Sequence, residues 1–565
     1  MIRRLILPAL AGLLCACGGG DEPTAGPADA EARFDWFSYE GRDEVFAQAL
    51  GEGDYQNPIL AGFYPDPSIT QVGGDYYLVN STFAYFPGIP VFHSTDLVNW
   101  MQIGNVIDRP GMLDFKDLGL SRGVFAPTIE HHDGLFYVAN TCVDCGGNFI
   151  VTAEDPSGPW SDPVWLPEVG GIDPSLFFDE DGKVYLMNND APVGEPRYDG
   201  HRAIWIREID PDTFQSISEP IVIIDGGVRP EENPIWIEGP HIYHVGEYYY
   251  LSSAEGGTAI NHSQVLARAD NVLGPYTPFE GNPVLTQRHL DPDREHPITS
   301  VGHADFVTDA EGNWWVSFLG VRPYEGDFYN TGRETFLMPV EWKDGWPIIT
   351  EGDELVPYQA ARPALPAAET PGIPMTGNFS LREEFDTPLD PYWLFVRVPQ
   401  EEWWQVEEGA LVLTSRAERL GDRKQPSVVA RRQQHLTATA MTLVEFTPTP
   451  DSEAGLLAMQ SDEYYFALGL GADEEGAHVI RLRRRAGGDQ SPRGDVVAEV
   501  PVEFSSGEAV RFRIEADRDI YRFAYAVADG EFTAIGGDQD GKLLSTRTAG
   551  GFVGATFGMY AEKAD

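Results

Sequence analysis

The chain has 565 residues, more than one ordinary hydrophobic core accommodates, so at least two domains are expected. Its 39 Lys and Arg face 89 Asp and Glu, and the formal net charge of −50 at pH 7 excludes electrostatic binding to nucleic acid and to anionic membrane surfaces. A neutral ligand fits this charge better. Aromatic residues make up 12% of the chain and gather in short runs, while 60 Gly and 43 Pro supply many turns. This composition predicts an all-β fold.

The first residues resemble an export signal. Two arginines precede an apolar run over residues 5–16 that is too short to span a bilayer. The run ends at Cys17, and three glycines follow, as in the lipid-attachment box of bacterial lipoproteins. Residues 1–17 are therefore interpreted as a lipoprotein-type signal peptide, with an ordinary cleaved signal as the alternative. The protein is expected to be exported and held on a bacterial membrane, periplasmic or at the cell surface, only through a lipid on Cys17. Residues 18–54 are acidic and are interpreted as a tether that packs in part.

Two later cysteines, Cys142 and Cys145, are separated by two residues. A structural zinc site needs two further ligands, and the sequence has no second cysteine pair outside the signal. In an exported protein the pair is interpreted either as a local disulfide or as two free thiols.

A repeat is hidden between residues 55 and 355. A polar turn followed by an aromatic strand occurs five times, and each instance has the pattern of a tight hairpin that leads to a buried strand. The five lie at residues 74–78, 133–138, 181–186, 246–251 and 311–316. A unit of about 60 residues suits one four-stranded sheet, and five such sheets around an axis form a five-bladed β-propeller. A β-sandwich with shared turn chemistry is the alternative, and the regular count of five argues against it.

Three of the five repeats carry a carboxylate 11 or 12 residues before the aromatic strand residue. These carboxylates are Asp66, Asp173 and Glu238, and the other two repeats have Ala126 and His303 at the matching place. The innermost strand of each blade lines the central channel of a propeller. The three carboxylates are therefore predicted to converge in that channel.

The end of the chain has a different composition. Residues 356–375 are rich in Pro and Ala and are interpreted as a linker. From 376 to 565, apolar and polar residues alternate in several runs, as half-buried strands require. This part is predicted to be a β-sandwich accessory domain without a carboxylate constellation of its own.

Three convergent carboxylates suit glycoside hydrolysis. That reaction needs one carboxyl group that is protonated and one that is ionised, and crowding separates their pKa values because like charges disfavour joint ionisation. A third carboxylate can maintain this difference. The same three groups could also bind calcium, which prefers several oxygen ligands, but no D-x-D-x-D loop supports such a site.

At these residues the sequence resembles glycoside hydrolase family 43. The resemblance covers nearly the whole first domain. It lies in residues 57–68, 85–88, 93–100, 124–128, 171–175, 238–241, 254–258, 302–305 and 332–336. In the second domain, residues 429–433, 453–456 and 550–554 resemble the concanavalin A-like β-sandwich appended to the β-xylosidase and α-L-arabinofuranosidase branch of that family.

The resemblance implies a five-bladed propeller followed by that sandwich, and inversion of the anomeric centre. Asp66 would be the general base that activates water, Glu238 the general acid, and Asp173 the residue that tunes and orients the acid. The residues implied to contact the substrate are Arg333, Phe86, Phe125, Ile172 and Thr258. Ile172 stands where some relatives have an aromatic residue, which puts close sugar stacking there in doubt.

His303 resembles the channel histidine that lies by a calcium or other divalent ion in some relatives; no other cofactor is implied. The sandwich of relatives narrows the mouth of the active site, which makes them exo-acting.

The leading hypothesis is a xylan 1,4-β-xylosidase that removes single xylose residues from xylo-oligosaccharides and arabinoxylan fragments. The nearest alternative is a non-reducing end α-L-arabinofuranosidase, or an enzyme with both activities, because the two pentoses present similar hydroxyl groups and one pocket contact discriminates weakly. Two alternatives of another class are a non-catalytic glycan-binding lipoprotein and a propeller that serves as a docking surface.

Overall fold

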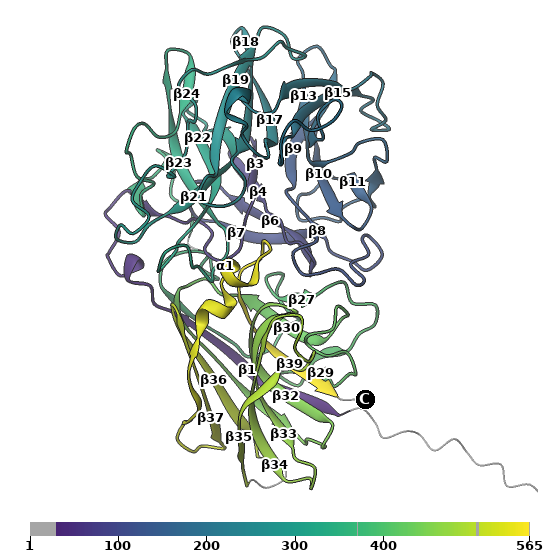
Figure 1. Ribbon diagram of the computed structural model, residues 1–565, viewed down its shortest axis with the longest axis vertical. Helices are drawn as coiled ribbons and strands as arrows, with labels where there is room; N and C mark the ends of the chain where they lie inside the picture. Colours follow the sequence, from purple (N-terminus) through teal and green to yellow (C-terminus); the bar gives the residue numbers. More distant parts are fainter. Residues whose placement is uncertain (1–29, 370, 504–507, 564–565) are drawn as a thin grey trace, which may run out of the picture.

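A propeller and a sandwich are stacked along the long axis of the computed structural model, which describes residues 30–369, 371–503 and 508–563 (Figure 1). The predicted signal peptide, Cys17 and the first part of the predicted tether lie outside the described residues. Where the chain is described, it contains no helix with the length and apolar character needed to cross a membrane. The prediction of an all-β chain with a five-bladed propeller followed by a β-sandwich is confirmed.

Five antiparallel sheets form the blades, and each sheet comes from one continuous stretch of chain. The first blade contains β3 (Ser68–Val72), β4 (Asp75–Val79), β6 (Gly88–Ser94) and β7 (Met101–Ile107). The second contains β8 (Gly123–Val124), β9 (Thr128–His132), β10 (Leu135–Val143), β11 (Gly147–Ala153) and β12 (Val164–Trp165). The third contains β13 (Ile172–Phe178), β14 (Val184–Asp190), β15 (Ala203–Ile209) and β16 (Ile221–Asp225).

The last two blades repeat this plan. The fourth contains β17 (Glu238–Val245), β18 (Tyr248–Glu255), β19 (Ser263–Ala269) and β20 (Thr277–Pro278). The fifth contains β21 (Thr299–Thr308), β22 (Trp314–Val321), β23 (Glu334–Lys343) and β24 (Trp346–Ile348). One strand of each blade contacts its counterparts in the two neighbouring blades, and together these strands form a closed ring around the axis. They are β3, β9, β13, β17 and β21. Each predicted aromatic hairpin therefore supplies the second strand of a blade, and the strand before it is the innermost one.

The sandwich consists of two eight-stranded sheets. One contains β28 (Trp404–Glu407), β29 (Ala410–Thr414), β1 (Glu31–Gly41), β31 (Thr437–Phe446), β36 (Val510–Asp517), β37 (Ile520–Val527) and β38 (Thr533–Asp540), with β26 (Phe379–Glu383) on β1. The other contains β35 (Asp495–Pro501), β34 (His478–Ala486), β33 (Tyr464–Ala472), β32 (Ser452–Ser461), β39 (Thr556–Lys563), β30 (Ser427–Arg432), β27 (Leu394–Val396) and β5 (Tyr85–Phe86).

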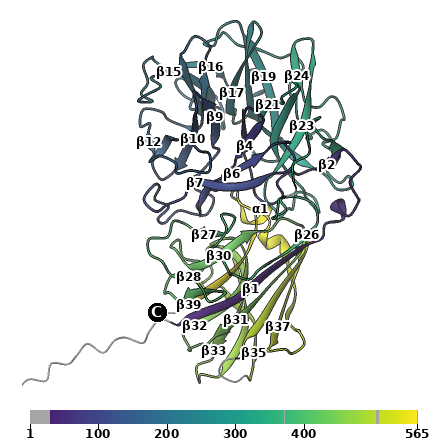
Figure 2. The same ribbon diagram turned by 180° about the vertical axis from the view of Figure 1, so that it is seen from behind.

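Strand β1 corrects one prediction. Residues 31–41 were expected to belong to a tether, but they form an inner strand of the sandwich, between β31 on one side and β29 and β26 on the other (Figure 2). Phe34, Phe37 and Tyr39 are buried in its core. The alternation of apolar and polar residues was visible in the sequence, but its partner strands lie in the second domain.

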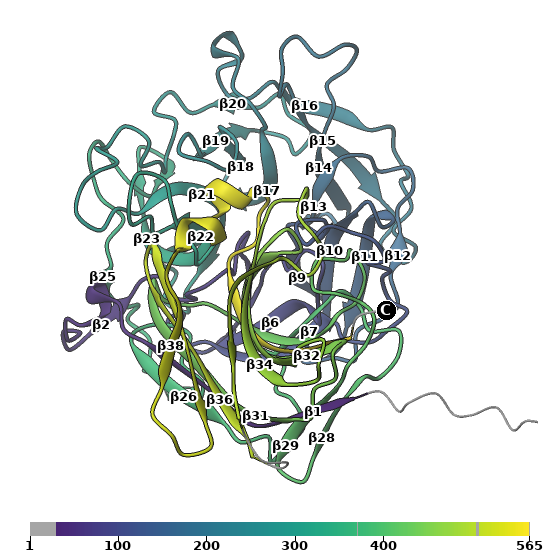
Figure 3. The same cartoon turned by 60° about the horizontal axis from the view of Figure 1, so that its bottom comes forward.

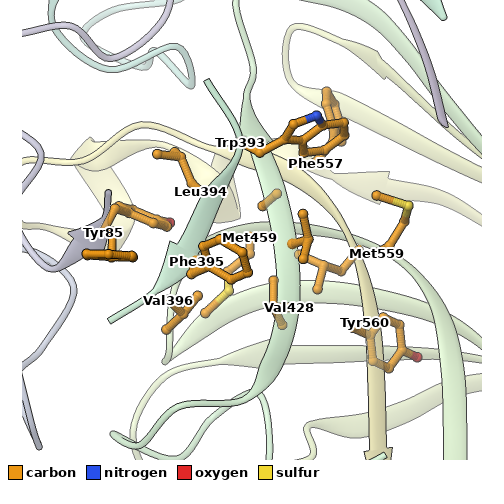
Figure 4. Close-up of a cluster of buried hydrophobic side chains, with 14 of the residues drawn as sticks. Tyr85, Trp393, Leu394, Phe395, Val396, Val428, Met459, Phe557, Met559 and Tyr560 are labelled. Atoms are coloured by element: carbon orange, nitrogen blue, oxygen red, sulfur yellow. The ribbon is translucent and has the colours of Figure 1, made fainter. Parts of the chain in front are cut away.

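The two domains share one core. Strand β5 leaves the first blade and pairs with β27, so a propeller segment extends a sandwich sheet. Figure 4 shows Tyr85 of β5 beside Leu394, Phe395 and Val396, within a buried cluster that continues through both domains. Helix α1 (Thr546–Ala549) lies on the propeller side of the sandwich (Figures 1 and 3).

Two local predictions are refined. Within the predicted linker, β25 (Gln359–Ala361) pairs with β2 (Asp54–Gln56), so this part of the linker is a short strand. Cys142 and Cys145 form a disulfide at the end of β10, which excludes the alternative of two free thiols.

Candidate active site

Asp66, Asp173 and His303 occupy one register position in their blades. Each lies two residues before a residue of the inner strand that pairs with the second strand, and all three have a left-handed backbone with φ between +52° and +56°. In the fourth blade this position belongs to Gly239, with φ +56°. Asp and His tolerate this region better than most residues, and Gly adopts it freely.

Glu238 therefore stands one position earlier than the repeat predicted. Its register equivalent in the third blade is Ile172, because a β-bulge follows both residues. The error arose from three successive tyrosines, of which Tyr250, not Tyr249, matches the aromatic residue of the other blades. The bulge re-aims the side chain, so the carboxylate of Glu238 still joins the other two.

Asp66 is held as an anion. It is 5% exposed, and its carboxylate accepts hydrogen bonds from Arg333 Nη1 at 2.9 Å and from Ser81 Oγ at 2.5 Å. Burial opposes its ionisation. Arg333, His303 and Ser81 outweigh burial, and they lower the pKa of Asp66 below its usual value.

The pKa values of Asp173 and Glu238 are raised, in contrast to that of Asp66. Burial, and then the negative charge of Asp66, raises the pKa of Asp173 to about 7. Burial raises the pKa of Glu238 well above its usual value, and the carboxylates of Asp173 and Asp66 raise it further. Asp173 Oδ2 also accepts a hydrogen bond from the backbone N–H of Gly239 at 3.1 Å, directly beside Glu238. The site thus pairs one ionised with one protonated carboxyl group near neutral pH, as acid–base cleavage of a glycosidic bond requires.

An aromatic wall adjoins Arg333. The guanidinium lies 5.8 Å from the ring centroid of Phe83 and 5.3 Å from that of Phe552, and these two rings stack on each other. Phe125 contacts both rings edge-on at 5.6 Å. Phe125 therefore belongs to the same aromatic wall as the two rings beside Arg333, and its predicted contact with the substrate stays a prediction. Phe552 belongs to the sandwich, and its N–H donates to Ser121 Oγ of the propeller at 2.8 Å.

Phe86 was predicted to contact the substrate, and that role stays a prediction. It lies in β5 with its ring beside Phe395 of the sandwich. Phe83, three residues earlier, is the ring of this loop that contacts Arg333.

The remaining two residues predicted to contact the substrate are Ile172 and Thr258. Ile172 directly precedes Asp173 and is half-buried. Thr258 is half-buried in the loop after β18. Among the described residues, neither side chain donates a hydrogen bond to the three carboxylates, and their roles stay predictions.

Two histidines complete the surroundings of Asp66. Burial lowers the pKa of His303 to about 4, and it does the same for His262. His303 packs against Gly239, where a Cβ atom would approach its ring to 2.9 Å. His262, which the sequence did not single out, donates its Nδ1–H to the carbonyl of Ser300 at 2.9 Å. Both rings are therefore neutral near pH 7.

Comparison with known proteins agrees with this geometry. The model of "Glycosyl hydrolases family 43" matches residues 55–347, and that of the "Beta xylosidase C-terminal Concanavalin A-like domain" matches residues 382–565. The chain belongs to glycoside hydrolase family 43. The predicted family, and with it the prediction of a glycoside hydrolase, is confirmed.

Several family 43 proteins resemble the chain over most of its length. A xylosidase/arabinosidase of Butyrivibrio fibrisolvens is 36% identical over 89% of this chain and 95% of its own. The non-reducing end α-L-arabinofuranosidase BoGH43B of Bacteroides ovatus is 37% identical over 91% of this chain and 92% of its own. A crystal structure of a GH43_12 protein from a capybara gut metagenome has a TM-score of 0.86 and 40% identity, and covers 94% of this chain and 99% of that one. This family 43 chain is therefore an exo-glycosidase of the β-xylosidase or α-L-arabinofuranosidase type.

The structure gives no support to the predicted channel cation at His303. Over the described residues, no group of three or more His, Cys, Asp and Glu side chains is placed to hold a metal ion.

Sequence reasoning missed residues that only the fold brings to the site. Ser81 and His262 lie in segments without a motif of their own, and Phe552 arrives from the other domain. Arg202 and Trp236 form a further pair, with the guanidinium 4.2 Å from the ring centroid, two residues before Glu238. The positive charge of Arg202 lowers the pKa of Glu238 and so offsets part of its rise, which shows that the pair lies close to the acid.

Proposed function

We propose that this protein is an inverting xylan 1,4-β-xylosidase that releases single xylose residues from the ends of xylo-oligosaccharides and arabinoxylan fragments. The observation that carries the mechanism is the opposite shift of two pKa values in one buried site, downward for Asp66 and upward for Glu238.

The chemistry follows from these charge states. Asp66 takes a proton from water, and the oxygen of that water bonds to the anomeric carbon. Glu238 gives its proton to the glycosidic oxygen on the opposite side as the carbon–oxygen bond breaks, so the anomeric configuration inverts. Asp173, which accepts a hydrogen bond from Gly239 beside Glu238, raises the pKa of the acid further when it is itself ionised.

The aromatic wall supports xylose as the preferred sugar. Phe83, Phe125 and Phe552 offer ring faces and edges next to Arg333. A xylopyranose chair has a broad C–H face that packs on such rings, while its hydroxyl groups need polar partners such as Arg333.

Two measurements test this proposal. Rates on 4-nitrophenyl β-D-xylopyranoside and 4-nitrophenyl α-L-arabinofuranoside are compared, and the anomer released first from xylobiose is followed by NMR. We expect faster xyloside hydrolysis and an α-anomer product. A retained anomer contradicts the mechanism. Asp66→Asn and Glu238→Gln should each lower kcat by at least about 100-fold, whereas unchanged turnover would contradict their roles.

Ile172 favours a second candidate, α-L-arabinofuranosidase activity. Ile172 is aliphatic at the register position of Glu238, where some relatives have an aromatic residue, and a furanose ring has a smaller flat face to stack. The Bacteroides ovatus and Butyrivibrio fibrisolvens relatives carry arabinosidase names. A clear furanoside preference in the rate comparison would establish this candidate instead.

We also propose export and membrane attachment through Cys17, on the strength of the N-terminal sequence alone. Metabolic labelling of the expressed full chain with an alkyne-bearing palmitate should label the wild type and not Cys17→Ser. Equal labelling of both would contradict the proposal.

A further inference from the structure

Arg432 of the sandwich extends into the propeller next to Asp66. It is the last residue of β30 and is 3% exposed. Its Nε–H donates to the carbonyl of Phe63 at 2.8 Å. The guanidinium lies 4.6 Å from the ring centroid of Phe63 and 4.2 Å from that of Tyr64. One sandwich side chain thus holds both residues of a propeller segment that ends two residues later at Asp66.

This guanidinium is costly to bury. No carboxylate in the described part of the chain pairs with Arg432, and its Nη2 has no hydrogen-bond partner there. A buried charge without an opposite charge destabilises a fold, and the two ring faces compensate only in part. The contacts that offset this cost are two hydrogen bonds, to the carbonyl of Phe63 and to Tyr64 Oη, and the two ring faces. All of them are made with the segment that leads to Asp66, so the arginine is bound to that segment specifically.

The segment that Arg432 holds needs external restraint. Residues 62–66 precede β3 and have no regular strand, and Asp66 has the left-handed φ of +53°. Such a conformation persists only when the surroundings fix it. On the propeller side, Asn80 Nδ2 donates to the carbonyls of Tyr64 and Pro65 at 3.1 and 3.0 Å. On the sandwich side, the corresponding restraint is Arg432.

We propose that Arg432 is a positioning residue through which the sandwich fixes the carboxylate of Asp66 against Arg333. The inference rests on the proposed role of Asp66 as general base. It assigns the sandwich a part in the hydrolytic step, separate from the ring that Phe552 adds to the aromatic wall. Without Arg432, the segment relaxes and the Asp66–Arg333 contact of 2.9 Å lengthens.

The adjacent arginine provides a matched control. Arg431 is also 3% exposed, but successive side chains of a strand point to opposite faces of the sheet. Its guanidinium lies near the rings of Tyr39 and Tyr392 inside the sandwich, and its Nη2 donates to Gln434. Arg431→Met therefore removes an equally buried charge from the same strand without touching the Asp66 segment.

The experiment compares Arg432→Met, Arg432→Lys and Arg431→Met in the full chain. Each is assayed for kcat, KM, the pH profile of kcat/KM and the melting temperature, on whichever aryl pentoside the wild type hydrolyses. A displacement of about 1 Å at a reacting group costs up to about 100-fold in rate, so we expect kcat of Arg432→Met to fall by about 10- to 100-fold with KM within about twofold.

The pH profile separates positioning from a structural role. When Asp66 moves away from Arg333, the arginine no longer compensates for the effect of burial, and the pKa of Asp66 rises. The acidic limb of the profile then moves to higher pH. The other groups that face Asp66, namely His303, His262, Asp173 and Glu238, are unchanged in all variants. Arg432→Lys keeps a donor but not the planar stack, so it should recover part of kcat and of the pH profile.

Two results would overturn the proposal. One is a wild-type kcat and pH profile in Arg432→Met, or in Arg432→Lys if the methionine variant does not fold. The other is the same loss and the same shifted limb in Arg431→Met. Asp66→Asn, assayed alongside, tests the general base itself: full activity of that variant defeats the proposed function, whereas normal activity of Arg432→Met defeats only this inference.

Discussion

Removing the hydroxyl of Ser81 should raise the pH at which the enzyme loses activity in acid. Ser81 Oγ donates to Asp66 Oδ2 at 2.5 Å, and Asp66 is only 5% exposed, so little water can replace the lost donor. A hydrogen bond to a charged group contributes about 1.5–3 kcal/mol. One pKa unit corresponds to about 1.4 kcal/mol, so Ser81→Ala should raise the pKa of Asp66 by about one to two units.

The assay is the pH profile of kcat/KM on an aryl pentoside. A general base works when ionised, so kcat/KM falls as the pH drops through the pKa of Asp66, and the acidic limb of Ser81→Ala should lie about one to two units higher than that of the wild type. Ser68→Ala is the control, because Ser68 Oγ donates at 2.7 Å to Asp305 in the same channel, not to Asp66. An unshifted limb in Ser81→Ala, or an equal shift in both variants, would refute the reasoning.

Three further predictions concern the wall, the acid and the disulfide. Phe552→Ala removes the ring beside Arg333 and its two aromatic contacts, each of which contributes about 0.5–1.5 kcal/mol. Steady-state kinetics should therefore show a kcat/KM at least about fivefold lower than that of the wild type. An unchanged value would contradict a role for the aromatic wall. Burial raises the pKa of Glu238, so the unfolded chain loses this proton first and the wild type loses stability as the pH rises above about 4.3. Thermal melting should therefore show Glu238→Gln gaining on the wild type as the pH rises above about 5, and a constant difference would argue against the raised pKa. Replacing Cys142 and Cys145 by Ser should lower the free energy of unfolding by about 2 kcal/mol in denaturant titrations, and reductant should abolish the difference.

The propeller could be predicted because its signals are local. A tight turn followed by aromatic strand residues indicates each blade, and both features depend only on residues close together in the sequence. The positions of Asp66, Asp173 and His303 follow from that register. Glu238 was placed one residue off because a run of tyrosines hid the register of β18, which only the hydrogen-bonded pairing resolves.

The rest depends on contacts between distant segments. The alternation in β1 was visible, but its partner β31 lies in the other domain, so the strand was interpreted as a tether. Neither Phe83 nor Phe552 lies in a motif that points to Arg333, so only the fold shows that their rings lie beside it. The pKa shifts of the carboxylates arise from burial among side chains of several blades, which no spacing in the sequence specifies.

The position of β1 in the sandwich also determines when this domain can fold during synthesis. Phe34 of β1 pairs with Val444 of β31, and the ribosome synthesises β31 about 400 residues after β1. Strand β1 therefore cannot form this pairing until then. At about 5–20 residues per second, this strand spends roughly 20–80 s without its neighbours, and a strand edge left open for that time is prone to pair wrongly. The propeller is finished within this interval, since β24 ends at Ile348. Expression of residues 376–565 alone therefore omits an inner strand, and a stable sandwich requires the N-terminal segment from Glu31 onward.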